Sequence, residues 1–494
     1  MGIPKEVEFV INELKNKGFE AYIVGGCVRD LLRGVEPHDW DITTNARPKE
    51  IEKTFLRTYS NNKFGTVTAQ VGSPKSEIGS RKSEFMDIEI TPFRTEEKYS
   101  DKRHPDQVRW AKTIEEDLSR RDFTINAMAI CSNLKFEHIE VIDLFGGQKD
   151  LENKIIKAVG NPEHRFSEDA LRMLRAVRLA TILNFTIEEK TAQAIEKNSA
   201  WLQVISKERI QEEIMKIIMA EKAADGIELL RRLNLLKYII PELEEGYKIT
   251  QNKHHIYDCY EHNLRSLDFA AKKSFNKYVR LAALLHDVGK PRTKRGEGAD
   301  ATFYGHEVVG AKMTFQILNR LKFSKKDIEK ITRLVRYHLF YYNVDEVGAS
   351  SIRRLVRQVG PENMEELLQV RMADRIGSGV PKAEPYKLRH LKYVIEKVNR
   401  DPLSVKMLKV SGMDVMKILN IKPGPKIGQI LDILLGYVLE GPEKNKKEFL
   451  EKEIKKLGKL SDEKLETFAQ KAKKEREKIE MKRDEMTKQK YWVT

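Results

Sequence analysis

The pattern of apolar residues changes once along this chain, near residue 158, and that change limits the folds that the chain can adopt. Before it, short β-like runs alternate with helical segments; after it, almost every segment repeats apolar residues at intervals of three and four. The β-like runs are AYIVGG, TVTAQVG, FMDIEIT, INAMAI and IEVIDLF. Short strands mixed with helices are typical of an α/β or α+β domain. The sequence therefore predicts a small mixed head followed by a long helical body.

Length and local composition divide the chain further. With 494 residues it is too long for one hydrophobic core. Histidines crowd between 254 and 338, and a Pro/Gly break, IKPGPKIG, precedes helices dominated by Lys and Glu. We expect a head at 1–158, a helical neck at 159–245, a histidine-rich domain at 246–380 and a charged helical tail at 381–494. Within that tail the Lys- and Glu-rich stretches 442–460 and 469–490 should be exposed helices or partly disordered.

Charge and apolar content restrict the partners and the compartment. Lysine and arginine outnumber the acids 90 to 75, a formal charge of +15, which favours a polyanion such as nucleic acid, although an ordinary basic surface would look the same. The first twenty residues look like a polar amphipathic helix rather than a secretion signal, and no apolar run approaches the roughly 18 residues needed to cross a bilayer. Three scattered cysteines predict neither disulfides nor a zinc site. We expect a cytosolic protein without a membrane partner.

Two glycines and two aspartates stand close together in YIVGGCVRDLLRGVEPHDWDI, residues 22–42. In a strand, Asp39 and Asp41 would point to the same face, and such a carboxylate pair suits Mg²⁺, which binds one or two carboxylates together with substrate phosphates. Gly25 and Gly26 would end a strand and open a short helix, so that backbone amides and Arg29 can meet phosphates. Each pattern alone is common in ordinary turns. Together, in this order, they predict a magnesium and phosphate site.

A third carboxylate is expected on a neighbouring strand. In FMDIEITPFR the alternation places Asp87 and Glu89 on one face, with Ile88 and Ile90 on the other. Spacing alone does not choose between the two acids.

Six motifs follow one another in a fixed order over roughly the first 220 residues: GGCVRDLL, HDWDITT, EITPFR, RRDFTINAMAI, DLFGGQKDL and SEDALRMLRAVRLA. They resemble the motifs of bacterial and eukaryotic CCA-adding tRNA nucleotidyltransferases, which belong with bacterial poly(A) polymerases to the DNA polymerase β superfamily. The resemblance implies an α+β head of the polymerase β type followed by an all-α neck, body and tail. It also implies addition of C, C and A to the 3′ end of tRNA from CTP and ATP, without a template.

The resemblance also implies roles for individual residues. Asp39 and Asp41 would hold the metal, and Glu89 would be the third catalytic carboxylate. The nucleotide would be bound by Gly25, Gly26, Arg29, Asp30, Arg121, Asp122, Asn126, Glu168, Asp169, Arg172, Arg175 and Arg178. Within this set the residues of RRDFTIN would meet the sugar and phosphates, although a helix start capped by Asp122 would give the same pattern.

Base selection is expected from the motif SEDALRMLRAVR. Asp169 and Arg172 would share one face of a helix, and Glu168 would lie in the same turn. A carboxylate acceptor beside guanidinium donors matches the amino group and ring nitrogen that cytosine and adenine both present, whereas guanine and uracil would leave buried groups unpaired. The alternative is a helix start capped by Ser167, and both can hold at once. The polar segment 96–110 resembles the flexible loop of the family, thought to help switch from CTP to ATP.

A second set of polar residues lies on or at the ends of different predicted helices: His262, His286, Asp287, His306, His338 and Asp374. Their order resembles the HD phosphohydrolase superfamily, whose residues of this kind bind one or two divalent metals. Imidazole with carboxylate suits Mn, Fe, Ni, Co or Zn better than Mg alone. The implied chemistry is hydrolysis of phosphate esters at RNA ends; the alternative is a degenerate HD fold kept for its shape.

Other functions stay open at this point. An A-adding enzyme or a poly(A) polymerase would share the fold. Hydrolysis by the HD domain could be the main activity instead. A non-catalytic RNA-binding protein would carry out neither nucleotide addition nor hydrolysis. RNA contacts are expected on KERIQEEIMK at 207–216, on RRLNLLK at 231–237 and on the basic tail, mainly through phosphates. The oligomeric state is open.

Overall fold

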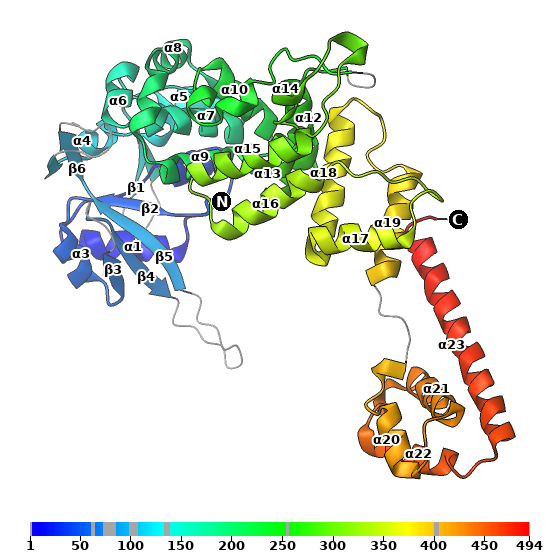
Figure 1. Ribbon diagram of the computed structural model, residues 1–494. Coiled ribbons are helices and arrows are strands. Elements are labelled where there is room, and N and C mark those ends of the chain that lie inside the picture. The colour runs from blue at the N-terminus through cyan, green and yellow to red at the C-terminus, as the bar shows by residue number, and fades with distance from the viewer. Residues whose placement is uncertain are drawn as a thin grey trace. The chain divides into compact units, whose positions relative to one another are not determined.

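The computed structural model describes residues 2–60, 65–72, 85–97, 107–132, 139–252, 256–399 and 405–493 (Figure 1). The chain forms two compact units. The first comprises Met1–Leu339 with Gln369–Pro381, and the second comprises Phe340–Leu368 with Lys382–Thr494. A mixed sheet is followed by helices, which confirms the predicted α+β head and all-α body.

The head is built on a seven-stranded sheet in the order β3-β4-β5-β2-β1-β8-β9. Its strands are β1 (Ala21–Val24), β2 (Asp41–Thr44), β3 (Thr58–Ser60), β4 (Val67–Gly72), β5 (Phe85–Pro92), β8 (Met128–Ser132) and β9 (Ile139–Asp143). Within this sheet β2 and β5 run parallel, and the other neighbours run antiparallel. All five β-like runs of the sequence contain a strand, although INAMAI begins as a 3₁₀ turn, η1 (Thr124–Asn126).

Apolar alternation decides which face of the sheet is buried. Ile42 of β2 and Ile88 and Ile90 of β5 are fully buried, and helix α1 (Lys5–Asn16) buries Val7 and Leu14 from its apolar stripe. The remaining helices of the head are α2 (Gly26–Leu32), α3 (Pro48–Thr54), α4 (Ile114–Ser119) and α5 (Gly147–Glu152). The residues that alternate with these buried ones, such as Glu89 of β5, lie on the opposite face of the sheet, where they are available for a functional site.

The expected flexible loop is flanked by a short antiparallel hairpin. Strand β6 (Arg94–Glu97) pairs with β7 (Gln107–Trp110), so the two ends of the segment are brought together. Residues 98–106 of that loop lie outside the described residues.

After the head, the first unit continues as packed helices. They are α6 (Pro162–Glu168), α7 (Leu171–Leu183), α8 (Glu189–Asn198), α9 (Lys207–Ile218), α10 (Ala223–Arg232), α11 (Pro241–Glu244), α12 (Cys259–Lys272), α13 (Lys277–Leu285), α14 (Lys290–Thr293), α15 (His306–Arg320) and α16 (Lys325–Tyr337). A two-stranded parallel ladder, β10 (Ile155–Ile156) with β11 (Thr186–Ile187), lies at its start. Gly226 of α10 allows close packing, since a Cβ there would come within 2.6 Å of Ile217 and Thr181. Helices α7, α9 and α10 thus form one tightly packed group.

The second unit has a hydrophobic core of its own. Its helices are α17 (Ala349–Val359), the first part of α18 (Met364–Gly377), α19 (Tyr386–Asn399), α20 (Gly412–Leu419), α21 (Pro425–Glu440), α22 (Lys447–Leu457) and α23 (Asp462–Lys490). Leu450 and Ile454 of α22 and Leu465 of α23 are fully buried against Ile430 and Leu434 of α21. For α22 the expectation of an exposed helix is therefore wrong, because sparse apolar residues spaced by three and four still form one buried face. Most residues of α23 after Gln470 are exposed, as expected.

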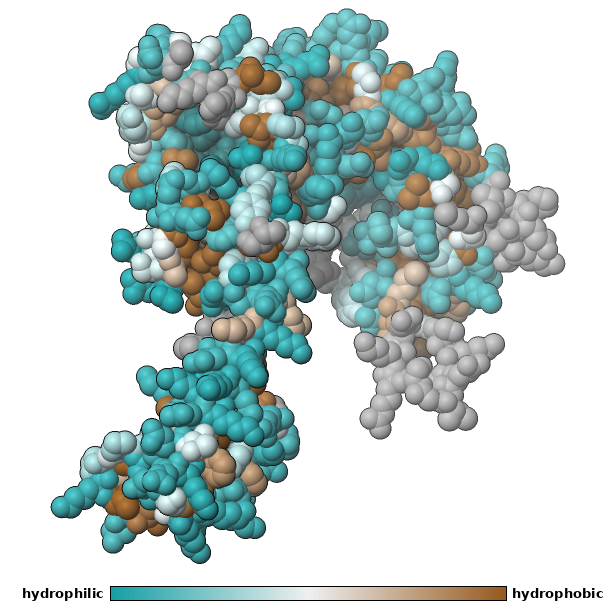
Figure 2. All heavy atoms as spheres, turned by 90° about the vertical axis from the view of Figure 1, so that its right-hand side faces the viewer, coloured by the Kyte–Doolittle hydropathy of each residue, from teal (hydrophilic) through white to brown (hydrophobic). Residues whose placement is uncertain are grey.

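Hydrophilic side chains cover most of the face shown in Figure 2, in keeping with the charged fraction of 33%. Across the described residues, we find no helix whose length and apolar content would let it span a membrane.

Candidate active site and metal centre

Two carboxylates meet where the parallel strands of the head lie side by side. Asp41 is the first residue of β2 and is paired in register with Glu89 of β5. Residues in register on neighbouring strands point to the same face of a sheet, so the two side chains are adjacent. Asp87 shares that face, but the pairing of β5 with β2 begins only at Glu89, so Asp87 has no partner in β2. Its partner is Gln70 of β4. The register therefore favours Glu89 over Asp87 as the third carboxylate.

Asp39 also lies near Asp41, but it is not in a strand as predicted. It is exposed and lies in a bend before β2, whereas the alternation argument required it to be in the strand. Burial raises the pKa of Asp41, Arg121 opposes that rise, and Glu89 and Asp39 add to it. The three acids therefore lie within electrostatic range of one another, an arrangement that a bound cation would relieve.

The backbone at Gly25 comes close to these groups. Gly25 has φ of +82°, and a Cβ there would lie 3.0 Å from Nη1 of Arg121 and 3.4 Å from Oδ2 of Asp41. A side chain would both strain the backbone and intrude on the two charged groups. Glycine at this position thus keeps the space beside Asp41 open.

Arg29 on helix α2 is held by two partners. It donates two hydrogen bonds to Asp30, at 2.9 and 2.7 Å, and one to Oδ1 of Asn126 at 2.9 Å. Arg29 and Asn126 line the cavity described next, whereas Asp30 is not among its lining residues. Asp30 therefore orients Arg29 in this structure.

A cavity of about 650 Å³ opens beside the carboxylates. Its volume is in the range of small-molecule sites. Eight of the lining residues are arginines: Arg29, Arg94, Arg120, Arg121, Arg172, Arg175, Arg178 and Arg209; four are acids: Asp41, Glu89, Asp122 and Asp169. Guanidinium groups bind phosphate through paired hydrogen bonds, so this excess of cations suits a polyphosphate.

Asp122 lies buried between the sheet and helix α7. Its carboxylate accepts from Nε of Arg175 at 2.6 Å and from the backbone N–H of Phe123 at 2.9 Å. Burial alone would raise the pKa of Asp122, but Arg175 and Arg172 outweigh it and lower that pKa to about 2. The carboxylate therefore stays ionised and holds Arg175 at the cavity wall.

Replacing Asp122 with asparagine is expected to destabilise the fold in a pH-dependent way. Because the pKa falls from 3.8 to about 2 on folding, the ionised group contributes about 2 kcal/mol to stability above pH 4, and this contribution disappears as the pH falls through 2. Urea unfolding of both proteins at pH 6 and pH 3 measures it. The difference in unfolding free energy should shrink at pH 3; a difference independent of pH would contradict the assignment.

The predicted base-reading residues are arranged differently from the single helical turn that we expected. Helix α6 ends at Glu168, Asp169 is extended with φ of −140°, and α7 begins at Leu171. The cause is local: Oδ1 of Asp169 accepts from the N–H of Leu171 at 3.0 Å, which ends one helix and starts the next. Ser167 caps neither helix, since it lies in the last turn of α6. Asp169 and Arg172 nevertheless both line the cavity.

Different partners hold these two side chains. Arg172 makes a short ion pair with Glu168 and donates to the carbonyl of Arg120 at 3.1 Å. Asp169 accepts from Nη2 of Arg209, on helix α9, at 2.7 Å. The acceptor and the donor are thus fixed independently on the cavity wall.

Three supporting residues were missed by the sequence argument. Asp117 is fully buried and accepts from Arg120 at 2.8 Å and Arg121 at 3.2 Å. Glu213 of α9 accepts from Arg178 at 2.8 Å, and Arg209 holds Asp169 as described. The spacing of Asp117 before the two arginines could have indicated the first contact. Nothing local in the sequence indicates the contacts of α9.

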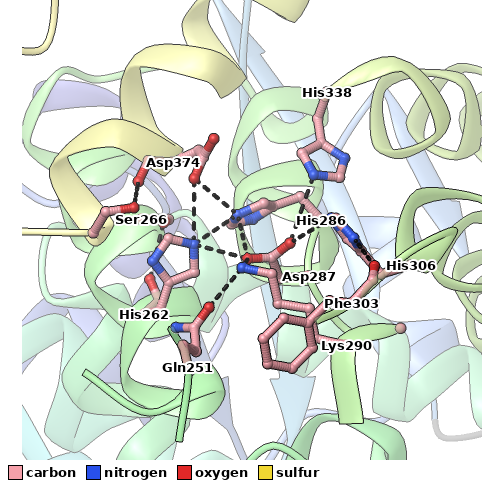
Figure 3. Close-up of polar contacts among 12 residues, drawn as sticks. Gln251, His262, Ser266, His286, Asp287, Lys290, Phe303, His306, His338 and Asp374 are labelled. Atoms are coloured by element: carbon pink, nitrogen blue, oxygen red, sulfur yellow. Dashed lines mark hydrogen bonds and ion pairs between the residues drawn. The ribbon is translucent and has the colours of Figure 1, made fainter. Parts of the chain in front are cut away.

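The six residues of the second set come together in the helical part of the first unit (Figure 3). They form two overlapping groups that share one carboxylate: His262, His286, Asp287 and Asp374 make the first, and Asp287, His306 and His338 make the second. Each comes from the end or the first turns of a different helix, as predicted, apart from the adjacent pair. The ligand atoms within each group lie within 4.8 Å of one another.

Asp287 stands between the two groups. Its Oδ2 lies 3.0 Å from Nε2 of His262 and 3.3 Å from Nε2 of His286, while its Oδ1 lies 3.3 Å from His306 and 3.6 Å from His338. One carboxylate that offers a different oxygen to each group can bridge two cations. Lys290 also contacts Oδ2, at 2.6 Å.

Backbone carbonyls orient three of the imidazoles. Nδ1 of His286, His306 and His338 lies 2.8, 2.7 and 2.7 Å from the carbonyls of Ala283, Phe303 and Val335. A proton held at Nδ1 leaves the lone pair at Nε2, which is the usual arrangement of metal-binding histidines. Buried imidazoles and carboxylates with this orientation fit one or two divalent cations.

Burial and charge act on the pKa values of this cluster in opposite directions. Burial lowers the pKa of His286, but Asp287 and Asp374 outweigh it and raise the pKa to about 10. Burial also opposes ionisation of Asp287, whose pKa is nevertheless held well below its usual range by Lys290 and His286. Without a metal, these carboxylates therefore keep a second proton on His286, which a bound divalent cation would displace.

Three family models match: the poly(A) polymerase head domain at residues 21–157, a probable RNA- and SrmB-binding site of polymerase A at 184–246, and the HD domain at 259–377. The CCA-adding enzyme of Enterococcus faecalis is 32% identical over 90% of this chain and 94% of its own length. The A-adding tRNA nucleotidyltransferase of Deinococcus radiodurans is 32% identical over 84% and 90%.

A solved structure agrees with these relatives. The CCA-adding enzyme of Bacillus stearothermophilus in complex with CTP superimposes with a TM-score of 0.59 at 26% identity, covering 92% of this chain and 98% of that one. The resemblance inferred from the six motifs is thereby confirmed. The chain belongs to the family of tRNA nucleotidyltransferases with a poly(A) polymerase head domain, and it is a nucleotidyltransferase.

Proposed function

We propose that this protein adds C, C and A to the 3′ end of tRNA, taking the nucleotides from CTP and ATP without a template. The observation that carries the proposal is the pair Asp41 and Glu89, in register beside Arg121, on the wall of a cavity sized for one nucleotide. The curated CCA-adding relative, aligned over 94% of its length, supports it.

In this proposal, the head performs an in-line transfer. The 3′ hydroxyl of the tRNA attacks the α-phosphate of the bound nucleotide, the bond to the β-phosphate breaks, and pyrophosphate leaves. Asp39, Asp41 and Glu89 would hold Mg²⁺, which when bound activates the hydroxyl and neutralises the departing charge. Arg29 and Arg121 would bind the triphosphate beside Gly25.

Base selection in this proposal rests on Asp169 and Arg172. The carboxylate of Asp169 accepts from the amino group of cytosine or adenine, and Arg172 donates to the neighbouring ring nitrogen. Because both side chains are held by other partners, they keep their positions when the base changes. Uracil and guanine would face them with groups of the wrong polarity, at a cost of about 1–3 kcal/mol for each unpaired group.

Three tRNA transcripts test the proposal, because the A-adding relative is as similar to this chain as the CCA-adding one. They end before CCA, in CC, and in CCA, and each is incubated with Mg²⁺ and CTP, ATP or both. We expect three residues added to the first, one A to the second and none to the third. Extension of only the CC-ended transcript would indicate an A-adding enzyme, and a long A ladder would indicate a poly(A) polymerase.

A second activity is favoured by the bridging position of Asp287. We propose that the histidine cluster holds one or two transition-metal ions, such as Mn, Fe, Ni or Co, and hydrolyses phosphate esters at RNA ends. An adjoining cavity of about 640 Å³ is lined by Asp287, His306, His338 and Asp374 together with the cations Lys290, Arg371 and Arg375. These cations would bind the phosphate ester beside the cluster, and a metal held there would supply the Lewis acidity that hydrolysis needs.

A further inference from the structure

Arg280 on helix α13 is a buried arginine whose partners are backbone carbonyls. It is 5% exposed, and its Nη1 donates to the carbonyls of Ile218 at 3.0 Å and Ala220 at 2.8 Å. Its Nε donates to Phe275 at 2.9 Å and its Nη2 to Ala271 at 3.3 Å. A buried cation is tolerated only when its donors are satisfied, so these carbonyls fix the guanidinium in place.

Two of those carbonyls belong to the end of helix α9. Ile218 is the last residue of α9, and Ala220 follows it by two. The last carbonyls of a helix have no partner within it and carry partial negative charge, so a guanidinium there satisfies them and stabilises the helix end. Arg280 thereby fixes the C-terminal end of α9 from within the segment, 259–377, that matches the HD domain.

Helix α9 also reaches the nucleotide cavity. Arg209, near its beginning, donates to Asp169 at 2.7 and 3.4 Å, and Glu213, in its middle, accepts from Arg178 at 2.8 Å. Asp169, Arg178 and Arg209 all line the cavity. A helix of 12 residues is about 18 Å long and behaves as one rigid body, so a shift at its end is transmitted to both contacts.

We propose that Arg280 is a positioning residue for nucleotide selection. By fixing the end of α9, it sets where Arg209 and Glu213 hold Asp169 and Arg178 relative to the incoming base. The HD segment thus takes part in nucleotide addition through its structure, independently of any hydrolysis at the histidine cluster. This inference rests on the proposed addition of CTP and ATP.

Replacing Arg280 with methionine tests the inference. The buried apolar volume is largely kept, but all four hydrogen bonds are lost. Because small displacements of binding groups have large kinetic effects, we expect KM for CTP and ATP to rise about tenfold or more, with more incorporation of UTP and a smaller change in kcat. Arg280→Lys, which keeps the charge but not the forked geometry, should recover part of the loss.

Leu334→Ala provides the matched control. Leu334 is fully buried on α16, outside the contacts of α9 described above, and its truncation should lower the melting temperature to a similar degree. The inference is overturned if Arg280→Met keeps the KM values and fidelity of the wild type below its melting temperature, or if Leu334→Ala changes them equally. A wild-type protein that adds no nucleotide would instead refute the proposed function itself.

Discussion

Replacing Asp41 with alanine is expected to lower the rate of nucleotide addition by about 10³-fold or more. Asp41 lies beside Glu89 and within reach of Arg121, so its removal deletes one of the groups that would hold the cation at the attacked phosphate. The fold should survive, because Asp41 is the first residue of β2 and the core contact next to it is made by Ile42. Single-turnover extension of a tRNA transcript ending before CCA measures the rate, and circular dichroism checks the fold.

The strand β5 supplies a matched pair of variants. Glu89→Ala should reduce the rate to a similar extent as Asp41→Ala, whereas Asp87→Ala should stay within about twofold of the wild type. Both acids are exposed and lie on the same face of one strand, so the two substitutions remove comparable charge. Equal losses for Glu89 and Asp87 would mean that general electrostatics, rather than a carboxylate site beside Asp41, explains the effect.

The comparison of these two acids shows what the sequence could predict in the head. Alternation correctly placed Asp87 and Glu89 on one face, because that depends only on neighbours along the strand. Which acid lies beside Asp41 depends on the register between β5 and β2, and these strands are more than forty residues apart in the chain. No local pattern fixes such a pairing, and only the family resemblance had selected Glu89.

The base-reading motif shows the opposite difficulty. The motif is helical on both sides of Asp169, but the helix is interrupted there. The aspartate side chain accepts a hydrogen bond from the N–H of Leu171, which competes with helical backbone bonding. The support from Arg209 comes from a helix forty residues further on, so pattern reasoning could name the side chains proposed to read the base but not what holds them. The helix periodicity of α9 predicted its existence and not its role.

The histidine cluster was the most predictable part of the site. Apart from the adjacent pair His286 and Asp287, each candidate ligand lies on or at the end of a different helix, and the helical periodicity already predicted this separation. What the sequence could not show is that the six residues divide into two groups around a shared Asp287. That division depends on the packing of five helices, and it leads to a quantitative expectation about metal content.

Replacing Asp287 with alanine is expected to abolish metal binding at the cluster, whereas His338→Ala should remove only part of it. Asp287 belongs to both groups of ligands, and His338 belongs to one. With Mn²⁺, Co²⁺ or Ni²⁺ in equilibrium dialysis, we expect about two ions for the wild type, one for His338→Ala and none for Asp287→Ala above the contribution of the head. Asp41→Ala in the same background measures that contribution.

Loss of the proposed metal site should also separate nucleotide addition from the proposed hydrolysis. Hydrolysis of a 2′,3′-cyclic phosphate on RNA should fall by about 10³-fold or more in Asp287→Ala, while CCA addition stays within a few-fold of the wild type. In Asp287→Ala, Lys290 would lose its carboxylate partner and keep only Gln251. Asp287→Asn therefore serves as a milder variant, because it keeps the volume of the side chain. Metals bound without any hydrolysis in the wild type would favour an HD fold kept for its shape. Equal loss of addition and hydrolysis would mean instead that the cluster supports the whole first unit rather than a second reaction.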